Sequence, residues 1–363
     1  MNTRVFLLFL LFSGPIPGLA QDSSDVSKPK PLTFSAYAEG YFVNDFDRPA
    51  NGYRPGFFDN FDRHGKLSLN LGFAKASYAK GAVRANLAMA AGTYMESNYA
   101  SEPGMLGHLL EANLGVRLDR KGRWWLDAGV IPSHIGFESN LGKDNMTLTT
   151  SIVSDNLPLY ETGVMLGYST EKGDWQFALL ALRGWQRIYL PAGYSMVSLG
   201  SQITYKPNDR LTLNHSGFFG TDTPDSARLF RQYHNLYGIF QLDPKLGLTV
   251  GFDIGWQQRT PHGKGSTAWL SPVAILRYRL TDRWAMALRG EYYGDPAGVI
   301  VATGTPNGFR TRGMSMNVDC KPFEKLLLRL EGRLLKSRDP IFTQEGRPKD
   351  WNAAVTMSVS IIL

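Results

Sequence analysis

The chain has 363 residues, with 39 Lys and Arg against 32 Asp and Glu, and a formal net charge of +7. This mild excess is spread without a basic run, so nothing indicates nucleic-acid binding. The single cysteine, Cys320, excludes an intramolecular disulfide and a cysteine-rich metal site.

The first 20 residues have the pattern of a secretory signal peptide. Arg4 gives a positive start, residues 5–12 are apolar, and small residues precede a cleavage point after Ala20. The apolar run is far shorter than the roughly 20 residues that span a bilayer. We therefore expect a signal peptide at 1–20, a short periplasmic segment at 21–31 and one domain at 32–363.

From Leu32 onward the sequence repeats a strand, a tight polar turn, a second strand and a longer loop. Seven tight turns are predicted, because Gly, Pro, Asn and Asp supply the backbone angles that such turns need. They lie at residues 80–81, 120–122, 172–173, 207–209, 243–244, 281–282 and 322–323. With one further strand at each end, the turns predict about sixteen strands and place both chain ends on the tight-turn side.

The segments between the turns alternate with period two. In residues 246–257, Leu, Val, Phe, Ile and Trp alternate with Gly, Thr, Asp and Gln. A water-soluble antiparallel sheet would also alternate. However, these segments are about 11 to 13 residues long, against about 5–6 for a typical soluble strand. Their polar face is also rich in glycine and in charges of both signs, as a wet lumen would be.

Every tryptophan lies near a strand end, whereas a soluble core would place tryptophan mid-strand at least as often. Five share the parity of the apolar face and are predicted to form membrane-interface belts: Trp124, Trp175, Trp256, Trp284 and Trp351. The predicted fold is therefore all-β, an antiparallel up-and-down transmembrane β-barrel of about 16 strands. We expect it in the outer membrane of a Gram-negative bacterium, surrounded by lipid, with periplasmic tight turns and long extracellular loops.

A barrel of sixteen strands leaves an aqueous channel unless something narrows it. The third long loop, residues 133–158, is the candidate constriction, and its candidate residues are His134, Glu138, Asp144 and Asp155. It also contains a short alternating piece at residues 146–152. We expect the loop to fold into the lumen, with its acids facing a basic wall across the opening. The alternative is an ordinary extracellular loop.

The basic wall is predicted from strand parity. It comprises Arg289, Arg329 and Arg333, with the acidic residues Glu291 and Glu331 beside them. Charged groups of this kind set ion preference in pores, so a weak preference for anions is expected. The alternative is that these charges pair across strands and only keep the lumen wet.

An enzyme is not expected. His215 and Ser216 are adjacent on a strand, so their side chains point to opposite faces and cannot act as base and nucleophile. No nucleophile elbow, phosphate-binding loop or closely spaced set of metal-ligating histidines is recognisable. We therefore predict no catalytic residues, no metal and no cofactor.

Two runs carry a family resemblance: GVIPSHIGFE at residues 129–138 and LPLYETGV at residues 157–164. They resemble the OmpL-like putative β-barrel porins, and the similarity extends over the mature chain. The resemblance implies an outer-membrane porin and brings no catalytic residues. The chain departs from many porins at its last residue, Leu363, where a terminal aromatic is usual.

The leading hypothesis is passive diffusion of small hydrophilic solutes through a lumen narrowed by the 133–158 loop. The second is a non-conducting barrel that acts as a binding or scaffolding component of an outer-membrane complex. The sequence leaves the solute, the ion preference and the formation of a homo-oligomer open.

Overall fold

The computed structural model describes residues 30–261 and 263–363. The predicted signal peptide, and the periplasmic segment up to residue 29, lie outside the described residues. Within the described ranges, no helix is long and apolar enough to cross a membrane.

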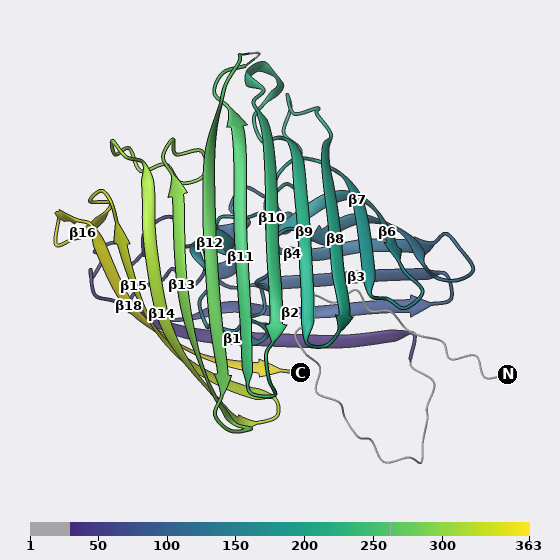
Figure 1. Cartoon of the computed structure of the whole chain (residues 1–363), viewed down its shortest axis with the longest axis horizontal. Helices are drawn as coiled ribbons and strands as arrows, with labels where there is room; N and C mark the ends of the chain where they lie inside the picture. The colour runs from purple at the N-terminus through teal and green to yellow at the C-terminus, as the bar shows by residue number, and fades with distance from the viewer. Residues whose placement is uncertain (1–29, 262) are drawn as a thin grey trace.

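Sixteen antiparallel strands close into a barrel (Figure 1), which confirms the predicted fold. The strands are β1 (Leu32–Asp45), β2 (Leu67–Lys80), β3 (Val83–Ala91), β4 (Leu109–Arg117), β5 (Trp124–Pro132), β6 (Tyr160–Ser169), β7 (Trp175–Leu182), β8 (Ser198–Asn208), β9 (Leu211–Thr221), β10 (Phe230–Gln241), β11 (Leu246–Gln258), β12 (Ser266–Arg279), β13 (Trp284–Asp295), β14 (Phe309–Phe323), β15 (Leu326–Ser337) and β18 (Trp351–Ile362). Each strand pairs with its neighbours along the barrel, and β1 closes the ring against β18. Closure gives every strand edge a partner, which a lipid environment requires.

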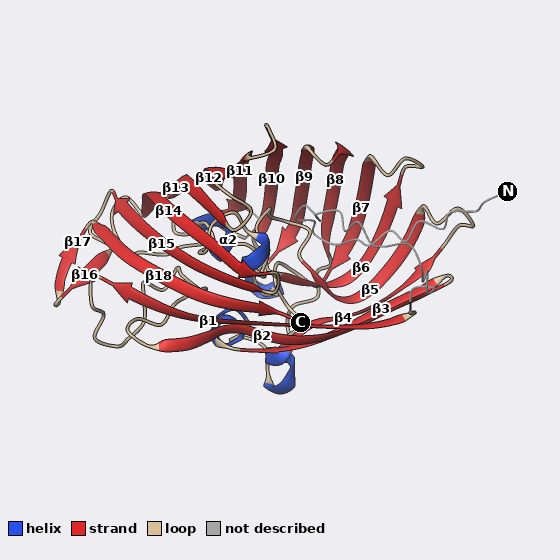
Figure 2. Ribbon diagram, turned by 90° about the horizontal axis from the view of Figure 1, so that it is seen from below, coloured by secondary structure: helices blue, strands red, loops and turns tan. Residues whose placement is uncertain are grey.

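Short helices and one hairpin lie in the long connections. They are α1 (Thr93–Asn98), η1 (Gly104–His108), η2 (Gly142–Asp144), α2 (Ile152–Asp155), η3 (Asp225–Ala227), and the paired strands β16 (Phe342–Gln344) and β17 (Arg347–Lys349). Figure 2 shows α2 inside the ring of strands. The lumen is therefore partly occupied by chain.

The seven tight turns all join consecutive strands, as predicted. Gly81, with φ of 63°, supplies the left-handed backbone at the β2–β3 turn, and Gly173 does the same between β6 and β7 with φ of 75°. The last turn lies at residues 324–325, slightly later than predicted, because β14 continues to Phe323.

Most strands carry apolar side chains outward and polar ones inward, although on β12 the buried, lumen-facing positions include Trp269, Val273 and Ile275, which join an apolar cluster with the inward loops. On β18, Met357 and Val359 are exposed, whereas Thr356 and Ser360 are buried in the lumen. Among the tryptophans predicted to form belts, four are exposed on the outside and Trp256 is half-buried: Trp124, Trp175, Trp284 and Trp351. This distribution is typical of a lipid-facing barrel surface.

A closed barrel of this kind should show heat-modifiable electrophoresis. We expect a compact, fast-migrating band from unheated detergent samples, a slower band after boiling and a circular dichroism spectrum dominated by β-structure. The reason is that the strand ladder has no free edge from which detergent could open it. A helix-rich spectrum would contradict the fold.

Candidate functional site

The connection between β5 and β6, residues 133–159, enters the lumen at His134. The imidazole Nδ1 lies 2.8 Å from the Glu161 carboxylate on β6, and Nε2 lies 2.9 Å from the Gly217 carbonyl on β9. Both partners are acceptors, which suits a doubly protonated ring. Burial alone would lower the pKa of His134, but the Glu161 carboxylate outweighs it, so that the pKa is raised. His134 is therefore a buried anchor of the connection, held through both ring nitrogens.

Glycines on the inner wall make room for the first part of the connection. A Cβ added at Gly200 would lie 2.8 Å from the His134 ring, and one at Gly251 would lie 2.5 Å from the Phe137 ring. Both approaches are closer than side chains tolerate. The wall of β8 and β11 is therefore shaped to receive residues 134–137.

The middle of the connection is held by arginines that donate to its backbone carbonyls. Arg289 reaches the Thr149 oxygen at 2.5 Å, and Arg333 reaches the Thr150 oxygen at 3.0 Å. Further along the wall, Arg277 donates to Met146, and Arg329 donates to Gly142 and Asn145. Apart from Gly142, which begins η2, these carbonyls belong to no helix or strand, so the arginines supply the donors that buried backbone requires.

Two wall carboxylates receive the amides of the same segment. Glu331 accepts from the Thr149 N–H at 2.6 Å and from Arg289 at 2.9 Å. Glu291 accepts from the Ile152 N–H at 2.7 Å and from Arg333 at 2.7 Å. Each carboxylate thus has both a cation and a loop amide, and such additional hydrogen bonds are what make a buried ion pair favourable.

This geometry corrects the expectation of acids facing a basic wall across an opening. The loop lies directly on Arg289, Arg329 and Arg333, and no gap separates them. Glu138 is turned inward to the Ser151 N–H and lies 3.9 Å from Arg289. The reason is that the backbone carbonyls of the loop accept hydrogen bonds from these arginines, which hold the loop against the wall.

The four candidate constriction residues consequently have different surroundings. His134 and Asp155 are buried, and the Glu138 side chain is 3% exposed, so none of the three faces open lumen. Asp144 is partly exposed and pairs with Lys143 at 2.5 Å. The predicted extended piece at residues 146–152 forms no strand, and α2 begins at Ile152.

A second loop, residues 46–66, also enters the lumen, which sequence reasoning missed. Phe57, Phe58 and Phe61 are buried, and Asn60 donates to Asp155 at 2.6 Å. Arg54 lies 4.0 Å above the Phe58 ring and pairs with an aspartate at the end of β1. The sequence did indicate a buried loop, because three phenylalanines within five residues are unusual for a loop that faces water.

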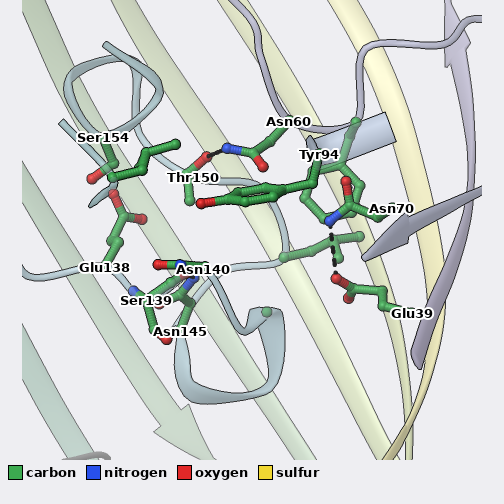
Figure 3. Close-up of a pocket in the computed structure, with 14 residues that line it drawn as sticks. Glu39, Asn60, Asn70, Tyr94, Glu138, Ser139, Asn140, Asn145, Thr150 and Ser154 are labelled. Atoms are coloured by element: carbon green, nitrogen blue, oxygen red, sulfur yellow. Dashed lines mark hydrogen bonds between the residues drawn. The ribbon is translucent and has the colours of Figure 1, made fainter. Parts of the chain in front are cut away.

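A small cavity lies where the two loops approach β1 and β2. Figure 3 shows Asn60, Tyr94, Glu138 and Asn145 around it, with Asn70 donating to Glu39 on the strands. Its volume of about 10 Å³ accommodates roughly one water molecule. On this side, therefore, the loops and the wall are in close contact.

The buried acid of α2 predicts a pH dependence of loop docking. Burial raises the pKa of Asp155 to about 7 and that of Asp59, in the neighbouring loop, to about 6. A carboxyl whose pKa is raised on docking binds its proton more tightly when docked, so docking weakens as pH rises from about 4 to about 7. The pKa of His134 is also raised, so docking should weaken further as the pH rises above the ordinary histidine pKa of 6.5.

We expect the single-channel current to be lower at pH 5 than at pH 8, and Asp155→Asn to reduce that difference. The amide oxygen of the variant can still accept from Asn60 and Thr150, so the packing should survive. An unchanged pH dependence in Asp155→Asn would show that this carboxyl does not control docking.

The structure keeps His215 and Ser216 apart, as predicted. Ser216 is buried in the lumen, whereas His215 is on the outer face, 3.0 Å from His234. Among the described residues, no group of three or more His, Cys, Asp or Glu side chains is placed to hold a metal ion.

Comparison with known proteins gives one family and several solved structures with a similar fold. The family model for putative beta-barrel porin-2, OmpL-like, matches residues 31–363. The anion-selective porin from Comamonas acidovorans is similar in structure, with a TM-score of 0.61 at 8% identity over 92% of this chain and 99% of that chain. The outer membrane channel DcaP of Acinetobacter baumannii has a TM-score of 0.58 at 12% identity, covering 92% and 97%.

A trimer form of in-vitro folded OmpT, an outer membrane protein of Vibrio cholerae, has a TM-score of 0.56 at 8% identity, covering 92% and 99%. At such identities the likeness concerns the fold alone. A search of curated proteins found no match.

Proposed function

We propose that small hydrophilic solutes diffuse passively through the lumen of this barrel. The chain belongs to the family putative beta-barrel porin-2, OmpL-like, and it is an outer-membrane β-barrel. The constriction in this proposal is the 133–158 loop. The tryptophans exposed at the strand ends would anchor the barrel at the two membrane interfaces.

The observation that carries the proposal is the tethering of the loop to the inner wall. Arg289 and Arg333 hold its backbone, while Glu331 and Glu291 hold its amides. While it is docked, a loop fixed in this way narrows the lumen steadily, whereas a free loop would fluctuate in and out of the path. The segment that borders the remaining space includes the partly exposed pair Lys143 and Asp144.

A swelling assay with liposomes containing the purified protein tests the function. We expect neutral sugars to enter at rates that fall steeply with their size, because the loop leaves only part of the cross-section open. Failure of every solute to enter, with a heat-modifiable and therefore folded barrel, would overturn the proposal. That result would favour the non-conducting barrel that binds or scaffolds other outer-membrane components.

We also propose that the barrel forms a homo-oligomer, a state that the trimer form of the structurally similar OmpT illustrates for the same fold. Light scattering on the unheated protein in detergent should give a protein mass that is a multiple of the chain. A monomer mass at all concentrations tested would contradict this assignment.

A further inference from the structure

The periplasmic half of the β2–β5 wall is left uncovered by the inward loop. In the extracellular half, Leu141 and Leu159 of the loop pack against a cluster that includes Leu71 on β2 and Val130 on β5, but among the described residues no hydrogen bond or ion pair joins residues 133–159 to β2, β3 or β4. The loop instead crosses β8 to β15 on the opposite side of the ring, as the positions of its arginine partners show. The side chains on the uncovered wall are therefore the ones that solutes in this half of the lumen would meet.

Two ion pairs on this wall expose their cations more than their anions. Lys75 on β2 contacts Glu111 on β4 at 2.5 Å, with side-chain exposures of 22% and 10%. Arg84 on β3 binds both carboxylate oxygens of Asp127 on β5, with exposures of 16% and 5%. In each pair the carboxylate is more buried than the Lys or Arg side chain that it contacts. The surface that faces the lumen is therefore positive, although each pair as a whole is neutral.

A third cation lies beside Arg84 at the periplasmic end of the wall, without a counterion among the described residues. Arg117 is half-buried at the end of β4, directly opposite Trp125 in the β4–β5 register. Its guanidinium makes no hydrogen bond or ion pair with any residue that the structure describes. The Arg84 guanidinium carbon lies 4.3 Å from the centre of the same indole ring, and its Nη1 has no partner among those residues either.

We propose that Arg84, Arg117 and Trp125 form a binding site for small oxyanions, carboxylates or phosphate, at the periplasmic mouth of the lumen, while Lys75, four residues further along the wall, adds to the positive surface beyond it. Guanidinium groups with unused N–H donors match the planar oxygens of such anions. The indole holds Arg84 in place by a cation–π contact and gives the site an apolar side. The role of the site in transport rests on the proposed diffusion function, whereas its anion binding does not.

The site also reassigns the predicted source of anion preference. Arg289, Arg329 and Arg333 are buried and occupied by loop carbonyls and wall acids, so they meet no solute. Arg84 and Arg117 are partly exposed and have donors to spare, and unlike Arg277 on the opposite wall they make no contact with the inward loop. The preference for anions is therefore set at the periplasmic mouth.

The first test is the reversal potential of the channel in a potassium chloride gradient. Arg117→Gln removes no hydrogen bond or ion pair between described residues and should fold normally, and Arg210→Gln removes an equal charge from the exposed β8–β9 turn outside the lumen. At low salt, a charge about 7 Å from the ion path changes the local anion concentration roughly two- to threefold. We expect Arg117→Gln to lower the chloride-to-potassium permeability ratio by about twofold, and Arg210→Gln to leave it unchanged.

Equal ratios for both variants and the unmodified protein would overturn the site's role in selectivity.

The second test does not depend on conduction. Phenylglyoxal, which modifies accessible arginines, should label Arg117, and mass spectrometry of the detergent-solubilised barrel can follow the rate. Inorganic phosphate or benzoate should slow labelling of Arg117 several-fold while leaving Arg210 unaffected. Labelling of Arg117 at an unchanged rate would overturn the binding site. A barrel that shows protection but no conductance would overturn only the diffusion function.

Discussion

Removing residues 143–150, with the ends joined through two glycines, should raise the single-channel conductance several-fold while the barrel stays folded. These residues include the carbonyls of Asn145, Met146, Thr149 and Thr150 through which four arginines hold the loop. The wall arginines retain their carboxylate partners after the deletion, since Arg289 keeps Glu331 and Arg333 keeps Glu291. The strand ladder, which carries barrel stability, is untouched. Planar-bilayer conductance and the heat-modifiable band would be measured together.

A matched control shortens the exposed β16–β17 hairpin at residues 345–347. This deletion also removes chain from a long connection but touches none of the arginine contacts, so conductance should not change. If the 143–150 deletion leaves conductance at its original value with the barrel folded, the loop does not form the constriction.

Arg289→Ala should destabilise the barrel interior more than any other single substitution on this wall. The guanidinium lies 2.9 Å from Glu331, 3.4 Å from Glu291 and 3.9 Å from Glu138, and its side chain is fully buried. Removing it leaves three carboxylates facing one another without their shared cation. Breaking a buried ion pair by deleting one partner costs about 3–5 kcal/mol. The variant should unfold at a lower temperature and give a noisier, larger current because residues 147–151 lose their main anchor.

Two further variants separate the loss of stability expected for Arg289→Ala from the effect of simply removing a positive charge. Arg279→Ala removes an exposed arginine from the end of β12, whose side chain makes only a hydrogen bond to the Pro244 carbonyl. Surface substitutions of this kind change stability by about 0.5 kcal/mol or less. Combining Arg289→Ala with Glu331→Gln should recover part of the lost stability, since one unpaired carboxylate is neutralised. An Arg289→Ala protein that unfolds like Arg279→Ala would show that the buried network contributes little.

The strands and turns could be predicted because their signals are local. The alternation in residues 246–257 and glycines such as Gly81 and Gly173 act within a few residues of themselves. A barrel then follows, because a two-faced strand in lipid must pair on both edges. Parity alone also identified the inward orientation of Arg289, Arg329 and Arg333.

The docking of the loop could not be predicted in the same way. It depends on contacts between residues far apart in the chain, such as Thr149 with Arg289, which are 140 positions apart. Sequence pattern cannot indicate whether Arg289 binds a solute, a neighbouring carboxylate or a loop carbonyl. For the same reason, the entry of residues 46–66 into the lumen was missed, although its phenylalanines indicated a buried loop.

The central claim is that this barrel conducts, and planar-bilayer recording of the purified, unmodified protein tests it most directly. We predict discrete, uniform current steps in potassium chloride, with a conductance below that of the 143–150 deletion and an anion-selective reversal potential. A protein that inserts as a heat-modifiable barrel yet gives no current steps between pH 5 and pH 8 would contradict the account.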